Sequence, residues 1–157
     1  MYNNYLDFIV HLHSVGRWLL LLVLLIAIFR SATAGNRNFT AGDQRIGTVL
    51  MIFTDLMLVI GLYLYFAGSW GRAQIEALGG MGEVMKSPTA RFFAIEHMVG
   101  MLVAIVLIHI GKVQGKRNLP HKTKHKRTFV FYLLALIVAV GSIPWPFREI
   151  GRARGWF

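Results

Sequence analysis

The chain has 157 residues, of which 55% are hydrophobic, and it contains no cysteine. This composition excludes a disulfide scaffold, an iron–sulfur cluster held by thiolates and a haem attached covalently through a Cys-x-x-Cys-His motif. A mean hydropathy of +0.54 and four long apolar runs predict a small integral membrane protein rather than a soluble domain.

The formal net charge of +10 is concentrated at the boundaries of the apolar runs. Basic residues flank these runs and cluster in one stretch, from Lys112 to Arg127. Such clusters set the orientation of membrane helices and contact anionic lipid headgroups. We therefore expect these basic residues to contact the lipid bilayer and not nucleic acid.

The first apolar run, from about residue 6 to 29, is too long for a signal peptide and lacks a small-residue cleavage site. It therefore predicts a first transmembrane helix. The run opens with His11-Leu12-His13-Ser14-Val15-Gly16-Arg17-Trp18, which places two imidazoles and a guanidinium inside a membrane span. Ionisable side chains are costly there, so this stretch is the first candidate for a functional site.

A second apolar run extends from about residue 41 to 66. Thr40-Ala41-Gly42-Asp43 resembles a capping box that opens this second helix. The run carries one acid, Asp55, near its middle. We expect the Asp55 carboxyl to lie inside the bundle, protonated or hydrogen-bonded, and it is a candidate for a proton-relay or quinone site.

The third predicted helix runs from about residue 88 to 111, because Ser87-Pro88 supplies an N-cap and a first-turn proline. The glycine-rich segment before it, Gly68 to Lys86, is expected to be a loop with one interfacial helical turn. After it, a basic loop is expected from Lys112 to Arg127, with solvated histidines at 121 and 125.

The fourth predicted helix runs from about residue 128 to 143 and ends at Pro144. Four helices with these connections predict a single domain, residues 1–157, folded as an all-α, up-down-up-down four-helix bundle in the membrane. Ten Lys and Arg fall on the side of the first and third connections and seven on the other, so the positive-inside rule places both termini outside. Aromatic residues cluster on that outer side: Tyr2, Tyr5, Tyr63, Tyr65, Trp70, Trp145 and Trp156.

The sequence His13-Ser14-Val15-Gly16 recurs as His97-Met98-Val99-Gly100 at the head of the third run. Each histidine lies six residues after a charged residue, Asp7 or Arg91, which is roughly 9 Å of helix at ~1.5 Å per residue. Both imidazoles are therefore expected at one depth, on helices that are diagonal neighbours in the bundle. This arrangement predicts one non-covalent haem b, with His13 and His97 as ligands of the haem iron.

The two glycines of the repeat support the same prediction. Gly16 and Gly100 each follow their histidine by three residues, on nearly the same helical face, where a missing side chain would leave room for a porphyrin. His11 is the alternative ligand in the first helix. Because His11 and His13 lie roughly 200° apart around the helix, they cannot both face the core, and we prefer His13.

Two further charged residues are candidates for the site. Arg17, one turn from His13, is expected either to meet a haem propionate or to pair with Glu96 or Asp55. Glu96 points about 100° away from His97, toward a neighbouring helix or the interface, and joins Asp55 as a candidate for proton or quinone chemistry. A second bis-His haem is not expected, because His109 has no matching histidine at the inner ends of the other helices.

These residues resemble a known group. The stretch from His11 to Trp18, the segment Arg91-Phe92-Phe93-Ala94-Ile95-Glu96-His97 and the tail from Ile143 through Pro146 to Phe157 are similar to short bacterial four-helix membrane proteins described as "cytochrome B"-like. The resemblance extends over nearly the whole chain. It implies a b-type cytochrome of the bacterial inner (cytoplasmic) membrane, although the chain lacks the second ligand set of two-haem cytochromes b.

Three functions stay open. The leading hypothesis is a mono-haem electron-transfer protein or subunit, rather than a stand-alone enzyme, with quinone as a candidate partner. The first alternative is a non-redox structural or assembly subunit of a membrane complex. The second is a divalent-metal-binding protein that uses His11, His13, Glu96 and His97. The haem of the leading hypothesis lies either within one chain or between two chains of a homodimer or larger complex.

Overall fold

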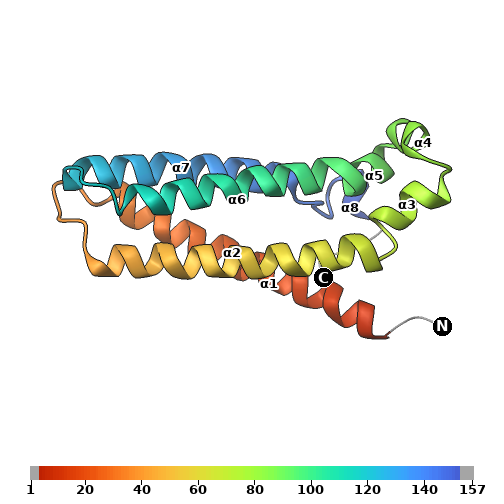
Figure 1. Ribbon diagram of the computed structural model, residues 1–157, viewed down its shortest axis with the longest axis horizontal. Coiled ribbons are helices and arrows are strands. Elements are labelled where there is room, and N and C mark those ends of the chain that lie inside the picture. The colour runs from red at the N-terminus through yellow and green to blue at the C-terminus, as the bar shows by residue number, and fades with distance from the viewer. Residues whose placement is uncertain (1–3, 153–157) are drawn as a thin grey trace.

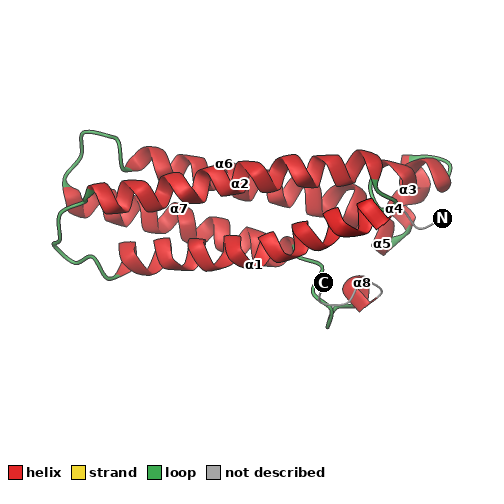
Figure 2. Ribbon diagram, turned by 90° about the horizontal axis from the view of Figure 1, so that it is seen from below, coloured by secondary structure: helices red, strands yellow, loops and turns green. Residues whose placement is uncertain are grey.

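The computed structural model describes residues 4–152, which form four long helices and several short ones (Figure 1). The long helices are α1 (Asn4–Ala32), α2 (Ala41–Ala67), α6 (His97–Gln114) and α7 (His121–Ser142). α6 continues a helical stretch that begins with α5 (Pro88–Arg91) and the π-helical turn η1 (Phe92–Glu96). The described residues contain no strand (Figure 2), and four helices are long and apolar enough to cross a membrane. The predicted all-α membrane fold is confirmed.

The four long helices form a bundle in which α1 and α6 are diagonal. α1 packs against α2 and α7, and α6 packs against the same two helices. Because successive long helices are joined at alternate ends of the bundle, the up-down-up-down topology is as predicted (Figure 1). Buried side chains from all four helices form the core: Leu20, Leu24, Ala27, Leu50, Ile108, Tyr132 and Ala135.

One end of the bundle, which we call the histidine end, carries the start of α1 and the start of α6. Three short helices also lie there, namely α3 (Arg72–Ala77), α4 (Met81–Lys86) and α8 (Glu149–Arg152) (Figure 1). The expectation of a loop with one helical turn before Ser87 is therefore incomplete. Val84 of α4 is fully buried against Ala90 and Ala94, and this apolar contact stabilises a second short helix. Tyr2 and Trp156, two of the predicted interface aromatics, lie outside the described residues.

The opposite end, which we call the basic end, carries the connections 33–40 and 115–120. The boundary predicted for the fourth helix is wrong there, because α7 begins at His121 and not near residue 128. The reason is packing. His125 is only 3% exposed, and its ring centre lies 4.9 Å from that of Phe39, so this histidine is not solvated as expected. The Phe39 backbone N–H also donates to His121 Nδ1 at 3.0 Å, which joins the first connection to the first residue of α7.

Asp43 organises the start of α2 at the basic end. Its carboxylate accepts from the Thr40 backbone N–H at 2.8 Å, which is the contact expected from the capping-box sequence. Arg37 and Arg30 reach the same carboxylate at 2.8 and 3.1 Å. The hydrogen bond from Arg37 to Asp43 raises the pKa of the Arg37 guanidinium. The first connection is therefore fixed by one acid and two bases.

Candidate functional site

A cavity of about 830 Å³ occupies the half of the bundle next to the histidine end. Its lining runs from Leu6 and Trp70, near that end, to Thr54 and Ile105 at the middle of the bundle. Ligand pockets in proteins measure about 300–1,000 Å³ and are mostly apolar, with a few polar groups. This cavity has that character, because aliphatic and aromatic side chains line most of it while His13, Arg17 and His97 also face it.

His13 of α1 and His97 of α6 come together across this cavity. Their ring centres are 6.4 Å apart and their ring planes are inclined by 79°. Two imidazole nitrogens bound to one metal ion at about 2.0–2.1 Å each would place the ring centres roughly 6 Å apart. The spacing of these two side chains from diagonal helices therefore fits an ion held between them.

His97 is oriented by the end of α7. Its Nδ1 lies 2.7 Å from the backbone oxygen of Ser142, the last residue of α7. A carbonyl oxygen only accepts, so Nδ1 carries the hydrogen and donates it. The last carbonyl groups of a helix have no partner within the helix, which makes this oxygen available. In the neutral tautomer the lone pair is then on Nε2, the arrangement usual for a histidine that binds a metal.

The π-helical turn η1 directly precedes His97, and the His97 backbone N–H bonds to the oxygen of Phe92, five residues back. Phe92, Phe93 and Ala94 are all buried. Three consecutive residues of an α-helix spread over about 200° and cannot share one buried face. The wider turn accommodates them, and such turns often occur at functional sites. The sequence predicts a continuous helix from about residue 88 to 111, without this turn.

The glycines of the repeat do not face the cavity, contrary to the prediction from the sequence. A Cβ on Gly16 would collide with the Met57 thioether, and one on Gly100 would collide with the Ser142 hydroxyl. These glycines therefore allow close packing against α2 and α7 rather than room for a porphyrin. Three residues turn a helix by about 300°, which leaves each glycine about 60° from its histidine. The glycine beside His13 is Gly61 of α2, where a Cβ would lie 3.4 Å from His13 Cε1.

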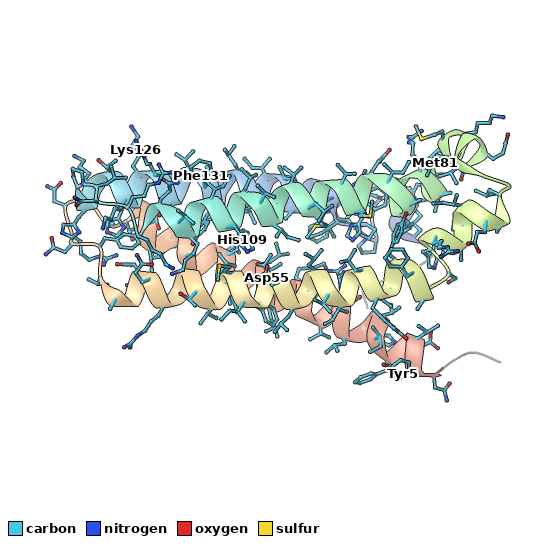
Figure 3. The ribbon with its side chains drawn as sticks, viewed as in Figure 1. Tyr5, Asp55, Met81, His109, Lys126 and Phe131 are labelled. Atoms are coloured by element: carbon cyan, nitrogen blue, oxygen red, sulfur yellow. The ribbon has the colours of Figure 1, made fainter. Side chains whose placement is uncertain are left out.

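The charged residues that were candidates for the site do not all lie at the cavity. Arg17 is half-buried in α1 and lines the cavity with His13. The acids proposed as its partners have other contacts, since Glu96 pairs with Arg91 at 2.6 Å and Asp55 pairs with His109 at 3.2 Å. The Asp55 side chain is 47% exposed and lies 3.2 Å from His109 of α6, so it sits at the contact between α2 and α6 and not inside the bundle as expected (Figure 3).

The structure gives little support to a site for a divalent metal ion. His11 is exposed on α1, and Glu96 is exposed beside Arg91, so neither joins His13 and His97 at the cavity. Within residues 4–152, no three side chains of His, Cys, Asp or Glu are grouped in a way that could hold a metal ion. The pair His13 and His97 is the arrangement that remains, and two imidazoles suit an ion whose other ligands come from a macrocycle.

Comparisons of the chain with protein-family models, with curated proteins and with solved structures give no match. The tail residues Gly155-Trp156-Phe157, which contribute to the resemblance described above, lie outside the described residues. A functional interpretation therefore depends on the cavity and on the two histidines that meet across it.

Proposed function

We propose that this chain binds one non-covalent haem b in the cavity, with His13 and His97 as axial ligands, and acts as a mono-haem electron-transfer protein or subunit. The observation that carries the proposal is the meeting of these two imidazoles, 6.4 Å apart, across an apolar cavity. When bound, a haem supplies a reversible one-electron iron couple, and its axial ligands help to set the potential.

The residues around the cavity have distinct parts in this proposal. The Ser142 carbonyl holds the His97 ring and fixes its tautomer. Gly61 leaves space beside the His13 ring. Arg17 brings a guanidinium into the cavity, where a haem propionate is a suitable partner because guanidinium and carboxylate form strong paired hydrogen bonds. Both histidines belong to one chain, which favours a haem within the chain over one shared by two chains.

The position of the cavity also limits the path of the electron. The cavity ends near Thr54 and Ile105, and the basic half of the bundle is filled by core side chains such as Leu24 and Tyr132. A single haem in the cavity would therefore exchange electrons near the histidine end and would not conduct across the whole bilayer. We place the protein in a bacterial inner membrane with both termini outside, supported by the ten basic residues on the side of the basic end against seven on the other.

A visible spectrum tests the proposal. The protein is purified in detergent from haem-replete cells, and haem and protein are quantified together before and after reduction with dithionite. We expect one haem per chain, a low-spin reduced-minus-oxidised spectrum and complete extraction of the haem by acidified acetone. A folded, colourless protein would overturn the proposal and would favour the structural or assembly subunit instead.

A further inference from the structure

The tail that follows α7 caps the last turn of that helix. The last carbonyl groups of a helix have no partner within it. Trp145 Nε1 donates to the Val140 oxygen at 2.8 Å. Arg148 Nη1 donates to the oxygen of the next residue, Gly141, at 3.2 Å. The Ser142 carbonyl comes directly after these two and accepts from the ring of the candidate ligand, so the tail holds the helix end that orients this ring.

Arg148 also contacts the aromatic ring beside His97. Its guanidinium carbon lies 5.5 Å from the centre of the Phe92 ring, which is within the range of a cation–π contact. Phe92 belongs to the π-helical turn and is only 2% exposed. Its ring centre lies 6.1 Å from that of His97, and the two planes are inclined by 35°. One guanidinium thus contacts both the ring beside His97 and the end of α7 that accepts the His97 hydrogen.

A guanidinium group suits both contacts. It is planar, so its face can lie on an aromatic ring while its edge donates hydrogen bonds, and a lysine ammonium has no such plane. Within residues 4–152, Arg148 forms no ion pair with a carboxylate, which leaves Phe92 and Gly141 as the groups that hold it. Arg148 does not line the cavity. Any effect of Arg148 on the site must therefore pass through its neighbours.

We propose that Arg148 is a positioning residue for His97, because it restrains two groups that contact the His97 ring. The inference rests on the proposed function, in which His97 binds the haem iron. With the Arg148 contacts in place, His97 keeps its hydrogen on Nδ1 and the lone pair on Nε2, at one ring angle. Without them, the end of α7 and the Phe92 ring are less restrained, so the His97 ring can rotate and change tautomer.

Nuclear magnetic resonance of the haem-free full chain tests this inference without relying on haem. The chain carries isotope-labelled histidine in lipid nanodiscs, and the His97 signals are identified by their loss in His97→Gln. We expect mainly the Nδ1–H tautomer. Arg148→Gln should move the ratio of tautomers about fivefold toward Nε2–H, the factor for one lost hydrogen bond of ordinary strength. His109 is the internal reference, because its Nδ1 bonds to the Ile105 oxygen within its own helix at 2.9 Å.

Matched variants separate positioning from the loss of a charge. Arg152→Gln removes an exposed positive charge from the same tail and should leave the His97 signals unchanged. Arg148→Lys keeps the charge but not the plane, and it should give an intermediate ratio. Phe92→Leu removes the ring that Arg148 contacts and should act in the same direction as Arg148→Gln. If Arg148→Gln does not fold, Arg148→Lys and Phe92→Leu carry the same test.

Electron paramagnetic resonance of the haem-loaded chain is the second readout. The g values of a low-spin ferric haem with two imidazole ligands depend on the angle between the ring planes, which is 79° for His13 and His97. We expect Arg148→Gln to shift or broaden this signal at unchanged haem content. Either an unchanged tautomer ratio or unchanged g values in Arg148→Gln would overturn the inference and leave the haem proposal intact. Colourless protein with the expected tautomer shift would overturn the haem proposal alone.

Discussion

The ring of His97 donates from Nδ1 to the backbone oxygen of Ser142 at 2.7 Å, so one side chain joins the start of α6 to the end of α7. The two helices can approach closely at this level because Gly100, three residues after His97, faces the Ser142 side chain with no Cβ of its own. The orientation of a candidate ligand thus depends on a glycine that does not touch the cavity.

Gly100→Ala should therefore lower the stability of the fold and change the orientation of the His97 ring. The added Cβ would collide with the Ser142 hydroxyl, and we expect a loss of about 1–3 kcal/mol in the free energy of unfolding, as for other overpacked contacts. Thermal denaturation in detergent measures this loss, and the haem spectrum reports on the histidine. The matched control is Gly141→Ala, whose Cβ would meet no atom within 4 Å. Equal behaviour of the two variants would contradict the packing described here.

Replacement of each candidate histidine by alanine tests which of them bind the haem iron. His13→Ala or His97→Ala should abolish the low-spin haem spectrum, because each removes one of the two facing imidazoles. His11→Ala, only two residues from His13, should leave the spectrum intact because His11 is exposed and does not line the cavity. Visible and electron paramagnetic resonance spectra of the three purified variants make the measurement. Full retention of low-spin haem in His97→Ala would refute the ligand assignment.

Asp43 should contribute more than any other acid to the stability of the basic end of the bundle. Asp43→Ala removes the acceptor of Arg37, Arg30 and the Thr40 N–H together, and we expect a loss of about 1–3 kcal/mol in the free energy of unfolding. Glu83→Ala is the control, because its ion pair with Lys86 is largely exposed and should contribute less than about 1 kcal/mol. Thermal denaturation of both proteins decides whether the Asp43 contacts stabilise the fold.

The orientation in the membrane is open to a direct experiment. Fusion of alkaline phosphatase to the C-terminus should give an active reporter, because we place both termini outside. Fusion of green fluorescent protein at the same point should be dark, since it does not fold after export in an unfolded state. The reverse result would invert the topology, and with it the side on which the cavity opens. A fusion within the connection 115–120 provides the matched control, with the opposite outcome expected.

Much of the fold follows from the sequence, because a membrane requires long apolar helices and penalises charges inside them. These requirements are enough to predict four spans, their alternating direction and the equal depth of His13 and His97. They do not determine which way each helix face points. In a soluble helix the polar stripe marks the outer face, whereas lipid and core are both apolar here, so exposed Leu22 and buried Leu24 look alike in the sequence.

The errors at the site have the same origin. The spacing of three residues already places Gly16 about 60° from His13 around the helix, but the sequence does not show that Met57 of α2 fills the space beside Gly16. The half-exposed position of Asp55 could not be predicted either, because nothing in the sequence shows that this side chain meets His109 at the contact between α2 and α6. At the basic end, packing of His125 against Phe39 extends α7 into residues whose charge suggested a loop.

The π turn at Phe92–Glu96 separates two registers within one continuous span. Such a turn contains one residue more than an α-helical turn, so it takes up that residue while the helices on its two sides keep nearly the directions they would have without it. Loss of a single residue within the turn would therefore leave an ordinary α-helical turn, with His97 facing nearly the same way. Loss of a residue elsewhere in the span would instead turn the residues beyond it by about 100° relative to those before it. This segment can thus change in length without changing the direction of the candidate ligand.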